Sequence, residues 1–393
     1  MERTEFMNVK ERDSAYVAHT YARFPLEIVS GKGATGYDEN GKKYIDLGTG
    51  IAVNTFGYCD DVWAEAVAKQ ASTLQHTSNL YYTGPCVKLA EMLCQKTGMS
   101  KVFFGNSGAE ANEGAIKAAR RYSFLKYGDG RSTIITLKNS FHGRTITTLS
   151  ATGQDVFHKE FGPFTEGFVY CEADNLDEMR SLTEQYSCCG IMIEVVQGEG
   201  GVHVLSDEFV KGIEALCKEK DLCLIVDEVQ TGNGRTGKLY GYMHYGIEPD
   251  IVSTAKGLAG GLPLGAVMLS DKVQHVFDPG SHGSTFGGNP VCCAGAVSVM
   301  ERLTDELLAE VEKKSQFIID SLTGAPGVKS ISGRGFMLGI ETDKSAKDVI
   351  AQCMEKGLLV LSAKTKVRLL PPLNISYEEL SEAMNILKEV LGA

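Results

Sequence analysis

Residues 222–230 read Leu-Cys-Leu-Ile-Val-Asp-Glu-Val-Gln, and residues 250–261 read Asp-Ile-Val-Ser-Thr-Ala-Lys-Gly-Leu-Ala-Gly-Gly. Each segment contains a short apolar, β-branched run, which is typical of a strand buried in a parallel sheet. Asp227 ends the first run and Lys256 follows the second. Ionisable groups at the ends of buried strands are costly without a partner, and α/β sheets bind ligands at these ends. The two segments therefore predict an α/β fold with a functional site between Asp227 and Lys256.

Strands and helices alternate from about residue 100 onward. The expected strands are 101–104, 133–137, 167–171, 190–196, 222–226, 251–254 and 265–269, with helices between several of them, for example at 109–127 and 207–220. This alternation predicts a mainly parallel sheet with helices on both faces. An Asn-Gly pair within residues 36–47 predicts a hairpin ahead of it.

After about residue 290 the pattern changes to that of a smaller α+β domain. A long helical segment is expected over 291–322, a strand over 332–340, and helices that open at Ser345 and Ser376, where the sequence matches a capping box. The expected division is an N-terminal segment (1–50) that packs with the small domain, a large domain (51–288) and a C-terminal small domain (289–393). A cleft is expected between the two domains.

The composition argues against several classes of protein. The chain has 393 residues, of which 43% are hydrophobic, and a net charge of −11. This charge argues against a nucleic-acid binder, no apolar run is long enough to span a membrane, and residues 1–6 lack the apolar core of a signal peptide. The eleven cysteines contain no Cys-x-x-Cys motif. We therefore expect neither a metal site nor disulfides, and a reducing cytoplasm fits best.

The surroundings of Lys256 favour a catalytic amine over a solvated surface lysine. No acid lies within five residues on either side, and the glycines that follow leave room for a ligand. Burial would lower the pKa of this amine and make it nucleophilic. Asp227 taken alone is better explained as a solvated acid or a helix cap. As a pair, the two residues suggest pyridoxal phosphate, which needs a lysine for a Schiff base and an acid at its ring nitrogen.

A third segment, residues 103–112, reads Phe-Phe-Gly-Asn-Ser-Gly-Ala-Glu-Ala-Asn, which predicts a strand, a glycine turn and the start of a helix. Backbone amides at a helix N-terminus bind anions, so this turn suits a phosphate. It also approximates the G-x-S-x-G elbow of a serine hydrolase, with Ser107 as the nucleophile. Such a hydrolase would need a later acid and histidine, for which the candidates are Asp227, Asp250, His275 and His282.

Further candidates come from three other segments. Residues 140–145 read Ser-Phe-His-Gly-Arg-Thr, in which Phe141 could cover a flat ring and Arg144 could bind a carboxylate. Arg368 lies inside an apolar run, so this cation needs an acid, and Glu199 is the expected partner. Residues 283–290 form a glycine-rich loop between the expected domains, and its hydroxyl groups suit a phosphate.

Together these segments resemble, over nearly the whole chain, the class III (ω-amino) pyridoxal-phosphate aminotransferases of fold type I. The resemblance lies in residues 106–111, 140–144, 197–199, 227–232, 255–257 and 284–290. Within this family the chain is most similar to the members that act on N2-acetyl-L-ornithine. The resemblance implies a ping-pong transfer of the donor's terminal amine to 2-oxoglutarate, giving N-acetyl-L-glutamate 5-semialdehyde and L-glutamate in arginine biosynthesis.

The resemblance also implies how individual residues hold the cofactor. Lys256 would form the Schiff base and then move the proton, and Asp227 would pair with the ring nitrogen. Val229 and Phe141 would pack on opposite faces of the ring. Gln230 would contact the ring hydroxyl.

The phosphate and the substrates are expected to meet a second set of residues. Ser107 and Gly108 would bind the phosphate together with the partner subunit's Thr285, which makes a homodimer necessary for activity. Arg368 would exchange Glu199 for a substrate carboxylate, so that one site accepts both substrates. The substrate-binding residues implied by the resemblance are Arg144, Glu199, Ser284 and Arg368.

Several alternatives stay open at this level. Within the family, the donor could be ornithine, succinylornithine, 4-aminobutyrate or N-succinyl-diaminopimelate, and an aminomutase is a further option. A serine hydrolase built on Ser107 belongs to another class. A non-catalytic binding protein would not need both Lys256 and Asp227. Tyr21, near the expected substrate end, has no assigned role.

Overall fold

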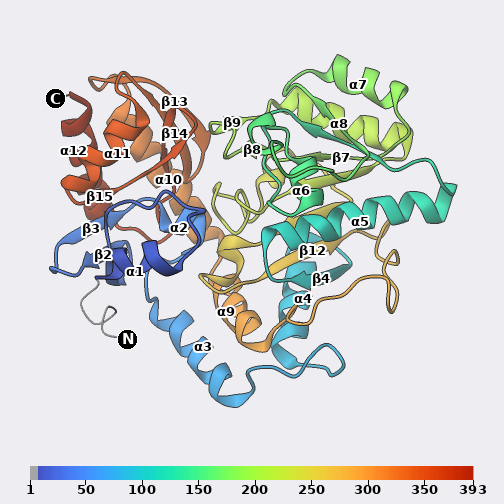
Figure 1. Ribbon diagram of the computed structural model, residues 1–393, viewed down its shortest axis with the longest axis horizontal. Coiled ribbons are helices and arrows are strands. Elements are labelled where there is room, and N and C mark those ends of the chain that lie inside the picture. Colours follow the sequence, from blue (N-terminus) through green and yellow to red (C-terminus); the bar gives the residue numbers. More distant parts are fainter. Residues whose placement is uncertain (1–7, 393) are drawn as a thin grey trace.

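The computed structural model describes residues 8–392, which are arranged around one seven-stranded sheet (Figure 1). Residues 1–6, where no signal peptide is expected, lie outside the described part. The strands, in spatial order, are β4 (Lys101–Gly105), β12 (Gly265–Leu269), β11 (Ile251–Thr254), β10 (Cys223–Asp227), β7 (Cys188–Ile193), β5 (Thr133–Leu137) and β6 (Phe168–Cys171). From β11 to β6 all neighbours are parallel, and β12 is antiparallel to both of its neighbours. The expected mainly parallel sheet is confirmed.

Alternate residues of β10 face opposite sides of this sheet. Leu224 and Val226 pack in one apolar cluster with helix α8 (Asp207–Lys220), whereas Cys223 and Ile225 pack in another with α5 (Gly108–Tyr127). Because both faces of the strand are covered, its sequence is apolar without alternation. The expected helices on both faces are therefore present.

The remaining elements of this part connect the strands or cover their ends. They are α2 (Thr49–Ala52), α3 (Asp61–Thr73), α4 (Gly84–Thr97), α6 (Ile146–Ala151), η1 (Asp155–Phe157), α7 (Leu176–Gln185), β8 (Val196–Gln197), β9 (His203–Val204), η2 (Gly241–His244) and η3 (Lys256–Ala259). The prediction of a strand over 190–196 is wrong at its C-terminal end, because β7 ends at Ile193. The chain leaves the sheet after Ile193, because Val196 and Gln197 pair instead with β9 in a separate two-stranded ribbon.

The C-terminal part forms a second sheet with helices. Its elements are α9 (Pro290–Met300), α10 (Asp305–Leu322), β13 (Val328–Arg334), β14 (Met337–Thr342), α11 (Ala346–Glu355), β15 (Leu358–Leu359), β16 (Leu361–Ala363), β17 (Lys366–Leu369) and α12 (Tyr377–Gly392). Strands β13, β14, β17 and β16 pair in that order. Helices α11 and α12 begin after Ser345 and Ser376 as expected, and each serine accepts a backbone hydrogen bond from the third residue of its helix.

Two predictions for this part are wrong. The segment 291–322 is two helices rather than one, because Thr304 adopts an extended backbone and caps α10 by accepting the N–H of Leu307. The segment 332–340, expected to be one strand, contains the end of β13, a tight turn and the start of β14, which pair as a hairpin. Gly335 makes that turn at a φ of 55°, and a β-carbon there would lie 2.4 Å from the backbone of Thr236.

The N-terminal strands lie against the C-terminal part (Figure 1). After α1 (Val9–Tyr16), strands β1 (Ile28–Lys32), β2 (Thr35–Asp38) and β3 (Lys43–Asp46) form an antiparallel sheet, and β15 extends it by pairing parallel with β3. The expected hairpin is therefore confirmed as β2 and β3. The division into domains at residues 50 and 288 stays a prediction.

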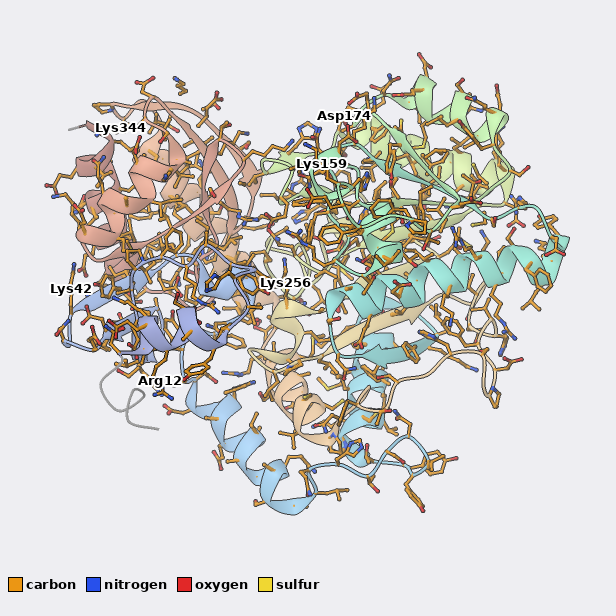
Figure 2. The ribbon with its side chains drawn as sticks, viewed as in Figure 1. Arg12, Lys42, Lys159, Asp174, Lys256 and Lys344 are labelled. Carbon is orange, nitrogen blue, oxygen red and sulfur yellow. The ribbon has the colours of Figure 1, made fainter. Side chains whose placement is uncertain are left out.

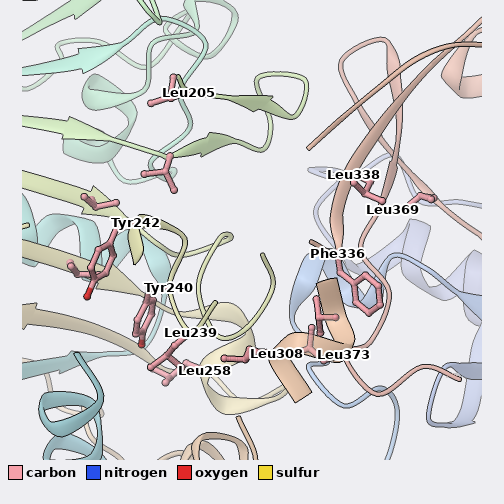
Figure 3. Packing of buried hydrophobic residues seen from close by; sticks show 14 of the residues in the cluster. Leu205, Leu239, Tyr240, Tyr242, Leu258, Leu308, Phe336, Leu338, Leu369 and Leu373 are labelled. Carbon is pink, nitrogen blue, oxygen red and sulfur yellow. The ribbon is translucent and has the colours of Figure 1, made fainter. Parts of the chain in front are cut away.

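One apolar cluster runs from the central sheet into the C-terminal sheet. Figure 3 shows Tyr240 and Leu258 on the side of the central sheet, and Phe336 and Leu338 on the side of the C-terminal strands. Leu369, from the same cluster, is the direct neighbour of Arg368 on β17. The shared core thus fixes the position of Arg368 relative to the ends of β10 and β11. Within residues 8–392, no helix is long and apolar enough to cross a membrane.

Candidate active site

Asp227 and Lys256 lie close together because their strands are neighbours. Asp227 is in register with Ser253 of β11, and Lys256 opens η3 just beyond the end of that strand. Figure 2 shows Lys256 near the middle of the molecule, between the central sheet and the C-terminal part. A cavity of about 260 Å³ lies at this point, lined by Gly108, Ala109, Asn112, Phe141, His142, Gly143, Arg144, Glu194, Glu199, Asp227, Val229, Gln230 and Lys256.

Three donors surround the carboxylate of Asp227, which is 4% exposed. The backbone N–H of Val229 donates to Oδ1 at 3.0 Å, and Nδ2 of Asn112 donates to Oδ2 at 2.7 Å. Nδ1 of His142 lies 2.8 Å from the same Oδ2. Burial alone would lower the pKa of His142, but its bond to Asp227 and the negative charges of Asp227 and Glu194 together raise the pKa. These three donors orient the buried carboxylate of Asp227 and leave it few free acceptor directions.

The amine of Lys256 has no hydrogen-bond partner among the described residues and faces the cavity. Its low-dielectric surroundings lower the pKa of Lys256 to about 8, although Glu199 and Asp227 partly oppose this shift. More of this amine is therefore neutral, and nucleophilic, near neutral pH than is the case for an ordinary surface lysine. The backbone at Lys256 has a φ of 45°, a region that costs energy for any residue with a β-carbon.

One end of the cavity is formed by the N-terminus of α5. Ser107 caps this helix by accepting the N–H of Glu110 at 3.1 Å, and Gly108 and Ala109 line the cavity. A β-carbon at Gly108 would lie 2.7 Å from Cγ1 of Val229, so a larger residue would close this end. The helix terminus presents unpaired backbone amides, which is a favourable place for a phosphate.

Arg368 and Glu199 form the ion pair that the sequence predicts. Nη1 of Arg368 donates to Oε1 of Glu199 at 2.6 Å and to Oε1 of Gln230 at 3.0 Å. Arg368 is only 3% exposed, whereas the side chain of Glu199 is 32% exposed. Burial would raise the pKa of Glu199, but the guanidinium of Arg368 outweighs this and lowers it.

Arg144 presents a cation that is free of ion pairs within the described residues. Its guanidinium lies 4.2 Å from the centre of the Phe157 ring and 5.5 Å from that of Phe141. Stacking on aromatic faces holds a cation in place without neutralising it. The two arginines thus differ, because the guanidinium of Arg144 has no acidic partner among the described residues, whereas that of Arg368 is paired with Glu199.

The structure does not bring every predicted residue to this cavity. Ser284 and Thr285 line a different hollow of about 520 Å³, together with Asn106, Glu110 and His282. Nδ2 of Asn106 donates to Oγ of Ser284 at 3.1 Å. Tyr21 is 73% exposed and does not line the cavity.

Sequence reasoning missed three residues with polar side chains that line the cavity, Asn112, His142 and Glu194. His142 stands inside the quoted segment 140–145, but nothing in the sequence places it against Asp227. Asn112 is a polar residue on the mostly apolar buried face of α5, a signal that could have identified it. Glu194 follows a fully buried strand in the same way as Asp227, and burial raises its pKa to about 7.

The family description "Aminotransferase class-III" matches residues 16–391 of the chain. The chain belongs to the class III aminotransferases. Its relatives include acetylornithine aminotransferases from Haemophilus ducreyi (51% identical, over 98% of this chain and 98% of the relative) and from Caldanaerobacter subterraneus (47%, over 97% and 98%). Similar solved structures include ornithine aminotransferase from Toxoplasma gondii (33% identical, TM-score 0.93, over 98% of this chain and 96% of that chain). Another is N-acetylornithine aminotransferase from Stenotrophomonas maltophilia (32%, TM-score 0.82, over 94% and 96%).

This class III aminotransferase is therefore a pyridoxal-phosphate-dependent transaminase of fold type I, acting on small amino acids and oxo acids. The residues of the cavity fit that cofactor. Lys256 offers an unpartnered amine, Asp227 a buried anion, and the terminus of α5 an anion site, all on one cavity. The expected cofactor and enzyme class are confirmed.

The serine-hydrolase alternative is wrong for this aminotransferase. Oγ of Ser107 is occupied in capping α5, and no histidine of the described residues contacts it. Asp227 is bonded to His142, Asp250 accepts from Leu224 and Lys272, and Nδ1 of His282 lies 2.9 Å from Nζ of Lys117. Asp227, Asp250 and His282 are therefore bonded elsewhere. His275 is exposed and makes no hydrogen bond to Ser107 in the described part of the chain.

Proposed function

We propose that this aminotransferase transfers the terminal amino group of N2-acetyl-L-ornithine to 2-oxoglutarate, giving N-acetyl-L-glutamate 5-semialdehyde and L-glutamate in arginine biosynthesis. The observation that carries the proposal is the 51% identity, over 98% of both chains, with a protein named acetylornithine aminotransferase. Arg144 lines the cavity and Arg368 is bonded to Glu199, which also lines it; two guanidinium groups agree with the proposal, because both substrates carry carboxylates. The solved ornithine aminotransferase at 33% identity makes ornithine the second candidate donor.

A panel of donors tests this assignment. With 2-oxoglutarate as acceptor, we expect kcat/KM for N2-acetyl-L-ornithine to exceed that for L-ornithine and for 4-aminobutyrate by at least about tenfold, a difference of about 1.4 kcal/mol in transition-state binding. Glutamate release is measured by a coupled dehydrogenase assay, with the acceptor held saturating. Equal or better use of ornithine would assign the enzyme to the second candidate.

Bound pyridoxal phosphate supplies an aldehyde that condenses with amines and a ring that accepts electrons from the bound substrate. Lys256 is proposed to hold this group through Nζ and, once released by the donor amine, to take the proton from the carbon that bears the nitrogen. Asp227 is proposed to keep the ring nitrogen protonated. Phe141 and Val229 are proposed to hold the ring from its two faces, and Gln230 to contact its hydroxyl.

The low pKa of Lys256 gives a prediction for loading of the cofactor. Because only the neutral amine reacts, the rate at which the apo-protein binds pyridoxal phosphate covalently should rise with pH and level off above about 8. A surface lysine would level off only near its ordinary pKa of about 10.4. Stopped-flow absorbance follows the reaction, with pyridoxal and free lysine as the reference. A rate that still rises steeply at pH 10 would contradict a buried, neutral Lys256.

The two arginines are proposed to divide the substrate carboxylates between them. Arg144, free of acids and stacked on Phe157, is proposed to bind the α-carboxylate of the donor. Arg368 is proposed to bind a carboxylate of 2-oxoglutarate or glutamate, which would displace Glu199. When the donor is bound, Glu199 returns to Arg368, so that no buried charge is left unpaired.

We further propose that the enzyme is a homodimer in which Thr285 reaches the neighbouring phosphate site and Ser284 the neighbouring substrate. Apolar side chains gather where this loop lies: Leu80 is 86% exposed, Tyr82 100% and Phe286 60%. Nδ2 of Asn79 donates to the carbonyl of Ser284 at 2.9 Å, which joins the two segments. Large exposed apolar groups mark interfaces.

A heterodimer tests the position of Thr285. Lys256→Ala and Thr285→Glu should each inactivate, the second because it places an anion beside the phosphate. Co-expressed with different tags and purified as the mixed dimer, they should regain about half the wild-type activity, since one of two sites then has both residues intact. A mixed dimer as inactive as its parents would place Thr285 in its own subunit's site.

The division at residues 50 and 288 and a cytoplasmic location also remain proposals. All eleven cysteines are free thiols, which suits a reducing compartment. Limited proteolysis and cell fractionation test these two points separately.

A further inference from the structure

Asn112 lines the cavity beside the Asp227 carboxylate. It is on α5, is 1% exposed, and uses its side chain fully. Nδ2 donates to Oδ2 of Asp227 and to the carbonyl of His142, both at 2.7 Å, and Oδ1 accepts the hydroxyl of Ser253 at 2.5 Å. We propose that Asn112 is a positioning residue for transamination, which holds the Asp227 carboxylate oriented and ionised; this inference rests on the proposed role of Asp227.

The orientation of the Asn112 amide is fixed by its partners. The hydroxyl of Ser253 has to donate to Oδ1 of Asn112, because an amide oxygen only accepts. The carbonyl of His142 and the carboxylate of Asp227 also only accept, so both must face the NH₂ group. A flipped amide would lose the bonds to His142 and Asp227, and the network therefore favours one arrangement.

This arrangement determines which oxygen of Asp227 remains open. Oδ2 receives two side-chain donors, Asn112 and His142, and has no further lone pair in a favourable direction. Oδ1 receives only the backbone N–H of Val229. Asp227 lines the cavity, so Oδ1 is the oxygen left to accept a protonated ring nitrogen.

Asn112 also joins the four segments that carry the proposed machinery. Its own helix begins at the phosphate end of the cavity, and its three bonds reach the loop of His142, the end of β10 at Asp227, and β11 at Ser253. Ser253 lies on β11, and Lys256 follows just beyond the end of that strand. A displacement of Asn112 would therefore change the distance between the anion and the amine.

A neutral donor suits this position because the site already contains many charges. Asp227 interacts electrostatically with four other ionisable side chains, those of His142, Glu194, Glu228 and Lys256. An amide adds a hydrogen bond to the anion without a further charge. An acid here would repel Asp227, and a base would neutralise it.

The test compares two variants. Asn112→Asp keeps nearly the same size but loses the NH₂ group that donates to Asp227, and Ser253→Ala removes only the hydroxyl that donates to Oδ1 of Asn112. The readouts are the dissociation constant of pyridoxal phosphate, the pH midpoint of its visible absorption band in the holoenzyme, and the Tm of the apo-protein. We expect Asn112→Asp to weaken cofactor binding about 10- to 100-fold, as loss of a bond to a charged group does. Ser253→Ala should act in the same direction but by less.

Ser123→Ala is the matched control. Ser123 is buried on the same helix, where its hydroxyl donates to the carbonyl of Arg131 at 2.7 Å, far along the chain from Asp227. It should lower the apo-protein Tm without changing cofactor binding or the pH midpoint. If Asn112→Asp and Ser253→Ala behave like this control, Asn112 is merely structural and the inference is overturned.

Asp227→Asn separates this inference from the proposal on which it rests. We expect it to move the pH midpoint, and Asn112→Asp to move the midpoint in the same direction. A shift in Asp227→Asn without one in the Asn112 and Ser253 variants overturns only the role of Asn112. No shift in Asp227→Asn overturns the proposed role of Asp227 as well. If Asn112→Asp does not fold, Ser253→Ala alone decides.

Discussion

Lys256→Ala is expected to reduce kcat by about 10⁴-fold or more, because it removes both the group that holds the cofactor and the base that moves the proton. No second lysine is available, because Lys256 is the only one among the described residues that line the cavity. Steady-state assays with N2-acetyl-L-ornithine and 2-oxoglutarate measure the loss, and the visible band of the covalently held cofactor should disappear.

The control for this prediction is Lys272→Ala. Lys272 is also partly buried, but it pairs with Asp250 at 3.1 Å on another part of the sheet and does not line the cavity. We expect near wild-type kcat from this variant and some loss of stability. A Lys256→Ala enzyme that keeps its visible band and more than a few per cent of its activity would show that another residue holds the cofactor.

Asp227→Asn is expected to lower kcat by roughly 100- to 1,000-fold, the range found when one preorganised electrostatic group is removed from an active site. The amide keeps the size of the carboxylate but carries no charge to stabilise a protonated ring nitrogen. His142 would also lose the anion that raises its pKa. The loss should appear in kcat for both half-reactions, since both depend on the same ring.

Glu228→Gln is the matched control for Asp227→Asn. Glu228 is the next residue and is fully buried, but its carboxylate accepts from Thr231, Gly241 and Tyr242, away from the cavity. This change should lower the Tm and leave kcat within a few-fold of wild type. Equal losses from the two variants would mean that Asp227 acts through stability alone.

Much of the fold follows from local sequence patterns. The strands around Asp227 and Lys256 are apolar without alternation because helices cover both faces of the sheet, and this continuous pattern is visible in one segment. The division of residues 291–322 was not predicted, because an apolar helical pattern continues across Thr304 and only the cap interrupts it. The hairpin at Gly335 was missed because its turn depends on the approach of Thr236 from another part of the chain.

The candidate site shows the same division between local and distant information. Lys256 and Asp227 could be identified because charge at the end of a buried strand is unusual within its own segment. The pair of Arg368 with Glu199 could be anticipated because a buried cation requires an acid. Asn112 and His142 could not be anticipated, because their role depends on bonds to Asp227. These bonds join residues that are 115 and 85 positions apart in the sequence.

The measurement that tests the central claim most directly is a half-reaction without acceptor. Holoenzyme mixed with one equivalent of N2-acetyl-L-ornithine should lose its visible band in a single phase and release N-acetyl-L-glutamate 5-semialdehyde stoichiometrically, and added 2-oxoglutarate should restore the band with release of glutamate. Lys256→Ala, reconstituted with cofactor, should do neither. A wild-type spectrum unchanged by N2-acetyl-L-ornithine but converted by L-ornithine would contradict the proposed function.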